Sequence, residues 1–598
     1  MSKRGGHVAF AMMTLSCNIS LSVLAAPNPI LLETEAWVRS RRSVVPHNIA
    51  PGITAVLVHG NDTHMFADGV QRLHGPEADM NTLMEVGSVT KTLVGLGLSA
   101  LVTKGHMTWN DPVRKWLGQE FALGTREYVS ESLTVRDLMA HRTGLAEGQG
   151  EFAYSWLNVP DFLRSFKNVE PMNTLRDVFA YSNAGWMIAG EVLRAATNTS
   201  SWCEGLRAHV LEPLNLTRTY CHRNEVPTTI AATHLAAVHK TDPCSGAGTG
   251  DPRVATYEFV ATGAPADFAW GAADASGSVI SSVADMSKVL ELLLGKASST
   301  FFARDVLQEM LTGQMITPSE WPESCGIADW SKQTRTAGHT GAAGLGFDYV
   351  GEISLIGKRF AYVEKSGDTD MHKARLGLLP EAGVGVLLLS NLGGSIGGPL
   401  TAMKFGVLAK LVGGSGDDAN LATDAALKTT GFWTNQWMPM TTCTACGTVG
   451  ASRKCSPSGF DAPPLPLASF EGAYGTEAYG TQALRLRASA DALTASIGAV
   501  QNSTLLFSNT SMVLQASCKA VASSLASQSV PWAGETISRL AALQGNCTLV
   551  EWVIPPEIPS AGVSARRGEV AFPYGCGIVP LPDGPSLYVI AHGGRGVM

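Results

Sequence analysis

The segment at residues 88–104 constrains the fold of this chain more than any other part of the sequence. It reads S-V-T-K-T-L-V-G-L-G-L-S-A-L-V-T-K and carries no charged residue between Lys91 and Lys104. An apolar run of this length predicts a helix that ends near Gly105, and a helix that is apolar on most sides has to be buried. The sequence therefore predicts a globular core around this helix, with Lys91 near its start.

Short apolar segments surround this helix in the sequence. Ile53–His59 and Met65–Val70, joined by Asn61-Asp62, predict a β-hairpin, and Val384–Ser390 predicts a buried strand. Helical patterns recur at residues 133–141, 184–197, 203–212, 283–295 and about 400–412. We therefore expect residues 27–415 to form one unit of mixed helices and strands.

The composition changes after residue 412. Gly413-Gly414-Ser415-Gly416-Asp417-Asp418 has the composition of a linker. Beyond it, Ala483–Leu493 and Thr548–Ile554 favour strands, and cysteines become more frequent. We expect residues 430–598 to form a separate β-rich domain that contains these cysteines.

Residues 1–26 have the pattern of a secretory signal peptide. Lys3 and Arg4 precede an apolar stretch from Val8 to Leu24, and Ala25-Ala26 follow it. An uncleaved membrane anchor is the alternative, and Asn18 weighs against it because an amide is costly inside a bilayer. The expected mature protein is secreted and has no membrane attachment.

Cysteine and glycosylation signals agree with secretion. Ten cysteines remain once Cys17 leaves with the leader, an even number that suits disulfides in an oxidising compartment. Cys443 and Cys446 have the spacing of half a zinc site, but no second pair lies near them, so disulfides are the favoured interpretation. Acceptor motifs for N-glycosylation occur after the leader at Asn61, Asn198, Asn215, Asn502, Asn509 and Asn546.

Charge and motif content exclude several classes of function. The formal net charge is −7, so the chain has no net positive field for a nucleic acid. The 14 histidines are scattered without an H-E-x-x-H motif, and no phosphate-loop motif occurs. We therefore expect neither a metal nor another cofactor.

Ser88 and Lys91 form the motif that carries chemistry. Residues three apart on a helix lie on the same face, so Lys91 is expected one turn from the Ser88 hydroxyl. A serine hydroxyl needs a base to become a nucleophile, and a buried lysine can supply one. A serine at a helix N-terminus also has backbone N–H groups nearby that can stabilise an oxyanion. The alternative is that Ser88 is an ordinary helix N-cap.

Two further short motifs follow the first in the chain. Tyr181-Ser182-Asn183 precedes a helical pattern, and His339-Thr340-Gly341 lies farther on. Together with S-x-x-K, this order resembles the serine β-lactamase and penicillin-binding-protein-like hydrolases, on the class C β-lactamase and D,D-carboxypeptidase branch. Secreted fungal β-lactamase-like proteins with a C-terminal β domain are the most similar. The other segments that carry the resemblance are Leu133–His141, Thr143–Leu145, Tyr181–Trp186, Gly277–Ser282 and Pro380–Asn391.

The resemblance implies an α+β fold of the β-lactamase/transpeptidase type. In that fold an antiparallel sheet is flanked by helices and joined to a helical subdomain. The resemblance also implies a nucleophile at Ser88, a proton acceptor at Lys91 and a proton-exchanging phenol at Tyr181. Asn183, His339, Thr340 and Gly341 would bind substrate, and the backbone N–H groups of Ser88 and Ala342 would form the oxyanion hole.

The third motif departs from the family pattern in its first residue. Drug-hydrolysing members have lysine where this chain has His339, and a histidine is mostly neutral near pH 7. We therefore expect the acyl substrate, a small molecule or a peptide-like compound, to be an ester, thioester or amide without an obligatory carboxylate. An acyltransferase or thioesterase-like cyclase is the first alternative. A non-catalytic binding protein that keeps the fold is the second.

A competing nucleophile motif occurs near the end of the first unit. Gly393-Gly394-Ser395-Ile396-Gly397 matches G-x-S-x-G and lies between a predicted strand and a predicted helix. The α/β-hydrolase order would then require His592, which lies in the cysteine-rich tail and matches that fold poorly. We interpret this segment as a turn after a core strand.

Overall fold

The computed structural model covers most of residues 28–429 and eight strands in the C-terminal part. The described residues are 28–44, 51–146, 159–241, 259–261, 271–296, 300–317, 341–369, 371–393 and 398–429, with the strands lying between residues 472 and 590.

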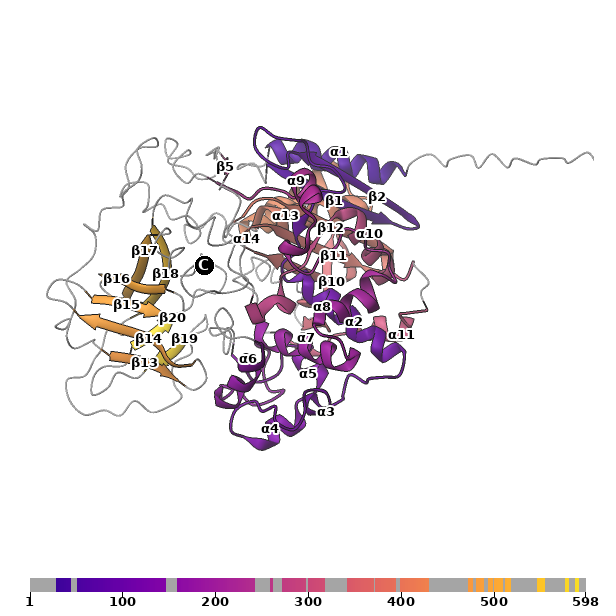
Figure 1. Ribbon diagram of the computed structural model, residues 1–598. Coiled ribbons are helices and arrows are strands. Elements are labelled where there is room, and N and C mark those ends of the chain that lie inside the picture. Colours follow the sequence, from indigo (N-terminus) through magenta and orange to yellow (C-terminus); the bar gives the residue numbers. More distant parts are fainter. Residues whose placement is uncertain are drawn as a thin grey trace, which may run out of the picture.

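An eight-stranded antiparallel sheet forms the centre of the first unit (Figure 1). Its order is β2-β1-β12-β11-β10-β9-β8-β7. The β1–β2 pair is the predicted hairpin and β12 has the predicted bounds, so both expectations are confirmed. The strands are β1 (Gly52–His59), β2 (Asp62–Gly69), β7 (Met315–Ile316), β8 (Ala342–Ala343), β9 (Tyr349–Leu355), β10 (Lys358–Asp368), β11 (Lys373–Leu379) and β12 (Val384–Ser390).

Helices cover both faces of this sheet. On one face α13 (Gly398–Leu411) packs against β11 and β12, and on the other α10 (Val283–Leu293) packs against β1 and β12. Along β1, alternate residues such as Leu57 and Val58 belong to the two different cores. A strand with both faces covered has to be apolar throughout, which explains the continuous apolar sequence.

The predicted apolar helix is α2 (Val89–Thr103), and every residue from Val89 to Leu101 is buried. It contacts β10 on one side and α7, α8 and α11 on others, which confirms the expectation of a buried central helix. The remaining helices beside α2 and around it are α3 (Val113–Leu117), α4 (Glu127–Ser132), α5 (Val135–Met139), α6 (Val159–Ser165), α7 (Asn183–Thr197), α8 (Trp202–Leu206), α9 (Thr228–His234) and α11 (Arg304–Met310).

The glycine-rich stretch at residues 413–418 is not a linker, and that prediction is wrong. It forms the turn between α13 and α14 (Gly416–Thr429), which pack against each other. Trp37 of α1 (Pro29–Val44) donates a hydrogen bond from Nε1 to Asn420 Oδ1 at 3.2 Å. The first unit therefore continues past the expected boundary at residue 415 and includes α14.

The C-terminal part contains a second eight-stranded antiparallel sheet, in the order β13-β14-β15-β16-β17-β18-β20-β19. The end strands β13 and β19 also contact each other, so the sheet curls towards closure. The two predicted strand segments fall largely on β14 and β18. The strands are β13 (Gly472–Thr476), β14 (Gly480–Ala488), β15 (Leu493–Ile497), β16 (Val500–Ser508), β17 (Ser511–Ser517), β18 (Asn546–Val553), β19 (Cys576–Val579) and β20 (Leu587–Ile590).

One disulfide lies within the described side chains. Cys203 on α8 is bonded to Cys221, 18 residues later in the chain. The Cys443–Cys446 motif and the predicted signal peptide lie outside the described residues. Among the residues that are described, no helix is both long enough and apolar enough to cross a membrane.

Candidate active site

Ser88 stands at the start of α2, where its hydroxyl is available for chemistry. Two short strands, β3 (Met84–Glu85) and β6 (Ile280–Ser281), pair immediately before it, and Gly87 then makes the turn at a φ of +53°. Ser88 is the N-cap residue, but its side chain makes no capping hydrogen bond. The alternative role of an ordinary N-cap therefore does not describe this serine.

Two side chains donate hydrogen bonds to the Ser88 hydroxyl. Lys91 Nζ lies 2.9 Å from Ser88 Oγ, and the Tyr181 hydroxyl also lies 2.9 Å from it. Lys91 comes from the next turn of α2, as the spacing predicts, whereas Tyr181 comes from the segment before α7. The structure thus brings together the three residues that the sequence identified as candidate catalytic groups.

Lys91 is fully buried, and its Nζ lies within hydrogen-bonding distance of three acceptors. Besides Ser88 Oγ, the acceptors are Asn183 Oδ1 at 2.7 Å and the Ser276 carbonyl oxygen at 2.7 Å. Ser276 ends a short 3₁₀ helix, η5 (Gly271–Ser276). Asn183 was predicted to bind substrate, and the structure shows that it also fixes the position of Lys91.

Lys365-Ser366-Gly367, near the end of β10, lies beside the serine. A Cβ atom added to Gly367 would stand 1.9 Å from the Val86 carbonyl oxygen and 3.2 Å from the Ser88 nitrogen. A Cβ added to Gly87 would stand 2.7 Å from the Asp368 nitrogen. The backbone of β10 therefore passes directly against the turn that precedes α2, in the place where a second oxyanion donor is needed.

The side chains of this β10 segment reach into the site. Lys365 is buried, forms an ion pair with Asp348, and places Nζ 3.4 Å from the Tyr181 hydroxyl. Its Nζ also lies 5.1 Å from the centroid of the Tyr181 ring, and Lys91 Nζ lies 5.0 Å from the same centroid. A positive charge on a lysine this close to the phenol would stabilise negative charge on its oxygen. Ser366 Oγ is buried and has no hydrogen-bond partner among the described residues.

The predicted third motif does not occupy this position. His339 and Thr340 lie outside the described residues, and Gly341 and Ala342 lie at β8, which β9 separates from β10. Two strand spacings amount to about 10 Å, so the Ala342 N–H is not the group beside Ser88, and that prediction is corrected. The third motif at the site is Lys365-Ser366-Gly367.

A sequence signal for this motif was present. A K-T-G tripeptide belongs to the same set of motifs as S-x-x-K, and Lys365-Ser366-Gly367 matches it with serine, the other small hydroxyl residue, in place of threonine. His339-Thr340-Gly341 matches two of its three positions and lies between Tyr181 and Lys365 in the chain, which made it a credible substitute. The competing Ser395 motif lies outside the described residues, between β12 and α13.

Asp368 follows the motif and has two cationic neighbours. Burial alone would raise the pKa of the Asp368 carboxyl, but the charges of Arg375 and Lys373 hold that pKa below its usual value. Arg375 Nη2 lies 3.0 Å from Asp368 Oδ1. The end of β10 is thus tied to β11 by ion pairs as well as by the strand ladder.

The described residues contain one group with the spacing of metal ligands. It consists of Cys203, Cys221 and Glu225, and the two cysteines are joined in the disulfide. A disulfide sulfur has no thiolate to offer a metal, so this group does not fit a metal site.

The chain is similar to several known proteins. Residues 41–402 match the family model described as Beta-lactamase. The unguisins hydrolase ungD' of Aspergillus campestris is 28% identical over 179 residues, which are 28% of this chain and 33% of that protein. The esterase EstB of Burkholderia gladioli is 29% identical over 180 residues, which are 27% of this chain and 45% of that protein. The matched regions thus span less than half of either relative.

Solved structures also match this chain, at low identity. The octameric penicillin-binding protein homologue from Pyrococcus abyssi is 17% identical, with a TM-score of 0.48. Its match covers 93% of this chain and 99% of that one.

Proposed function

We propose that this chain, which belongs to the β-lactamase family, is a serine hydrolase that works through an acyl-enzyme on Ser88. The observation that carries the proposal is the pair of hydrogen bonds to Ser88 Oγ, one from Lys91 Nζ and one from the Tyr181 hydroxyl. A serine between two proton-exchanging groups at a helix N-terminus has what acyl transfer requires.

The proposed reaction has two steps. Ser88 Oγ attacks the carbonyl carbon of the substrate while its proton passes to Lys91 in the neutral amine form, and Tyr181 delivers a proton to the leaving group. Lys91 passes the proton that it received to the Tyr181 phenolate, which returns both groups to their starting forms. Water then attacks the acyl-enzyme carbonyl, the acid is released, and the proton lost by the water is delivered through these two groups to Ser88 Oγ. The backbone N–H groups of Ser88 and Asp368 are the proposed oxyanion donors, because β10 lies against Ser88.

We propose esters, thioesters and amides without an obligatory carboxylate as substrates. The expectation first rested on a neutral histidine at position 339, and that basis no longer applies because Lys365 stands at the site. The structural support is now the buried Asp348, whose carboxylate pairs with Lys365 and compensates its charge. The names of relatives, a hydrolase of unguisins and an esterase, agree with acyl substrates of this kind.

Covalent labelling tests the nucleophile. The full-length mature protein is treated with a fluorophosphonate probe, and the modified peptide is identified by mass spectrometry. Modification of Ser88, lost in Ser88→Ala, supports the proposal. Modification of Ser395 instead would assign the chemistry to the competing motif, and no labelling of folded protein would support a binding role.

Substitution of Asp348 in the ion pair with Lys365 tests the proposed substrate preference. Wild-type protein is compared with Asp348→Asn on a p-nitrophenyl ester and on a chromogenic cephalosporin, which carries a carboxylate. Removal of the Asp348 charge leaves Lys365 uncompensated, so the cephalosporin rate is expected to rise relative to the ester rate. Efficient cephalosporin hydrolysis by the wild type, at about 1–1000 per second, would contradict the proposed preference.

We also propose that the protein is secreted. Two observations support this: the Cys203–Cys221 disulfide, and the exposure of the three acceptor asparagines whose side chains are described, Asn61, Asn198 and Asn215. Expression in a secreting fungal host, followed by treatment with an N-glycosidase, tests it. A mass that does not change on deglycosylation would contradict the glycosylation prediction.

A further inference from the structure

His141 lies against the candidate proton-transfer residue, although no role has yet been given to it. Its ring stacks on the Tyr181 ring, with centroids 4.4 Å apart and planes inclined by 23°. Lys91 Nζ and Lys365 Nζ lie 5.0 Å and 5.1 Å from the centroid of the same phenol ring, so one aromatic ring and two lysine side chains surround Tyr181.

His141 accepts hydrogen bonds from the residues on either side of Tyr181 in the chain. The His141 carbonyl oxygen accepts from the Ala180 nitrogen at 3.0 Å, and His141 Nδ1 accepts from the Ser182 nitrogen at 3.0 Å. The residues before and after Tyr181 are therefore both bound to the same histidine, while its ring limits the rotation of the phenol.

His141 adopts an uncommon backbone conformation that allows these contacts. Its φ is +56°, a region that few residues other than glycine occupy, although asparagine and histidine are enriched among those that do. The next residue, Arg142, accepts at its carbonyl oxygen from the Arg176 nitrogen at 2.9 Å. Residues 141–142 and 176–180 thus run side by side and are joined through the main chain.

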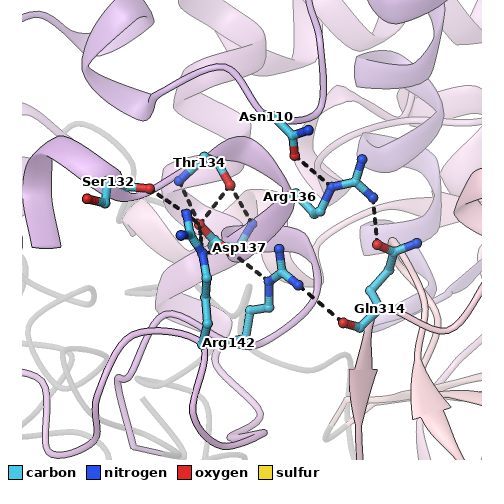
Figure 2. Close-up of polar contacts among 8 residues, drawn as sticks. Asn110, Ser132, Thr134, Arg136, Asp137, Arg142 and Gln314 are labelled. Atoms are coloured by element: carbon cyan, nitrogen blue, oxygen red, sulfur yellow. Dashed lines mark hydrogen bonds and ion pairs between the residues drawn. The ribbon is translucent and has the colours of Figure 1, made fainter.

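A buried carboxylate holds this pair of segments together, as Figure 2 shows. Asp137 accepts from Arg142 Nε at 2.7 Å and from Arg176 Nη2 at 2.8 Å, and it completes a capping box with Thr134. Arg142 also donates to the Gln314 carbonyl oxygen at 3.2 Å. Burial alone would raise the pKa of Asp137, but hydrogen bonds from Arg176 and Thr134 and the charge of Arg142 keep that pKa below its usual value.

We propose that His141 is the positioning residue for Tyr181, fixing the phenol against the Ser88 hydroxyl without touching substrate itself. This rests on the proposed function, because the position of Tyr181 affects the rate only if Ser88 is the nucleophile. The proposal requires a neutral ring, since only an unprotonated Nδ1 can accept from the Ser182 nitrogen.

The surroundings keep this ring neutral. Burial, followed by the charges of Lys365 on β10 and Lys91 on α2, holds the pKa of His141 well below its ordinary value. Together with Tyr181, these are the titratable groups that face it among the described residues. Protonation at acid pH would remove the acceptor for Ser182 N–H and add a positive charge beside the phenol.

Two substitutions test separately the two proposed contributions of His141, the stacking of its ring on Tyr181 and the hydrogen bond that its Nδ1 accepts. His141→Asn keeps an acceptor near the Nδ1 position and tolerates the positive φ, but it removes the stacking surface. His141→Phe keeps a ring and removes the acceptor. His239→Asn is the matched control, because His239 is also fully buried and its Nε2 accepts from the Leu73 nitrogen at 3.1 Å, in the short strand β4 (His239–Thr241).

The readouts are kcat, KM and the pH dependence of kcat on a p-nitrophenyl ester, with thermal melting to show that each variant folds. We expect His141→Asn to lower kcat by about 10–100-fold with little change in KM, because a misplacement of about 1 Å is enough for such a loss. We expect His141→Phe to retain more activity than His141→Asn, and the acid limb of kcat to change in both variants. The control should keep the wild-type kcat and pH profile.

Two results would overturn the proposal. The first is a wild-type kcat and pH profile in both His141 variants, and the second is an equal loss in the His239→Asn control. Failure of the proposed function gives a different result, since the fluorophosphonate probe would then leave Ser88 of the wild type unmodified.

Discussion

Substitution of Gly367 by alanine tests the statement that the β10 backbone forms the wall of the active site. The added Cβ would stand 1.9 Å from the Val86 carbonyl oxygen, whereas such contacts are essentially never shorter than 3.0 Å. Both Val86 O and Ser88 N are backbone atoms, so no side chain can rotate away to make room. The end of β10 therefore has to move away from Ser88 by about 1 Å.

This displacement should affect catalysis more than stability. It would withdraw the proposed Asp368 donor from the oxyanion, and loss of one such donor costs about 10²–10³-fold in kcat. The overpacking itself costs about 1–3 kcal/mol of unfolding free energy, which a domain of this size tolerates. We therefore expect folded Gly367→Ala protein with about 100-fold slower fluorophosphonate labelling and ester hydrolysis.

Gly377→Ala on β11 is the control for this experiment. Its added Cβ would meet only side-chain atoms, of Leu408, Lys404 and Tyr362, at 3.3–3.4 Å. Its rates should stay close to those of the wild type. Wild-type labelling by Gly367→Ala, in protein with unchanged melting behaviour, would refute the assignment of β10 as the strand beside the nucleophile.

Three other predictions follow from the described contacts. Lys91→Met should lower the rate of Ser88 labelling by about 10²–10⁴-fold, and an unchanged rate would exclude Lys91 as the proton acceptor. Burial first, and then nearby cations, hold the pKa values of His141 and His372 well below 6.5, so the folded state binds fewer protons than the unfolded state does. The free energy of unfolding should therefore fall as the pH decreases below about 6.5, which urea titrations at pH 7 and pH 5 would measure. Cys203→Ala/Cys221→Ala should lose about 3 kcal/mol of unfolding free energy, and a reducing agent should lower the melting temperature of the wild type more than that of the double variant.

Local features of the structure could be predicted because they depend on neighbours in the chain. The apolar run after Ser88 indicated a buried helix, and the spacing of three placed Lys91 one turn from Ser88 on the same face. The β1–β2 hairpin and the buried strand β12 were also readable, since alternation and apolar runs reflect burial directly. Tyr181 was identified from the Tyr181-Ser182-Asn183 motif before a helical pattern, and in the structure the Ser182 side chain caps that helix, α7.

Features that depend on distant segments could not be read in the same way. The glycine-rich stretch after α13 has the composition of a linker, but Trp37 and Arg41 of α1 bind α14 beyond it. Glycine permits a tight turn between packed helices as readily as it permits a flexible connection. Only the contacts with α1, almost 400 residues earlier, distinguish these outcomes.

The position of the third motif beside Ser88 was decided by the tertiary structure. The sequence indicated a serine, a lysine and a tyrosine suited to acyl transfer, and the tripeptide His339-Thr340-Gly341 was chosen as the third motif although Lys365-Ser366-Gly367 was also present. Which tripeptide lies beside Ser88 was decided by the order of the strands, since β10 packs against the start of α2 while β8 lies two strands away. Strand order arises from pairing and packing across the whole sheet, so the local patterns around Gly341 and Gly367 did not by themselves decide between the two tripeptides.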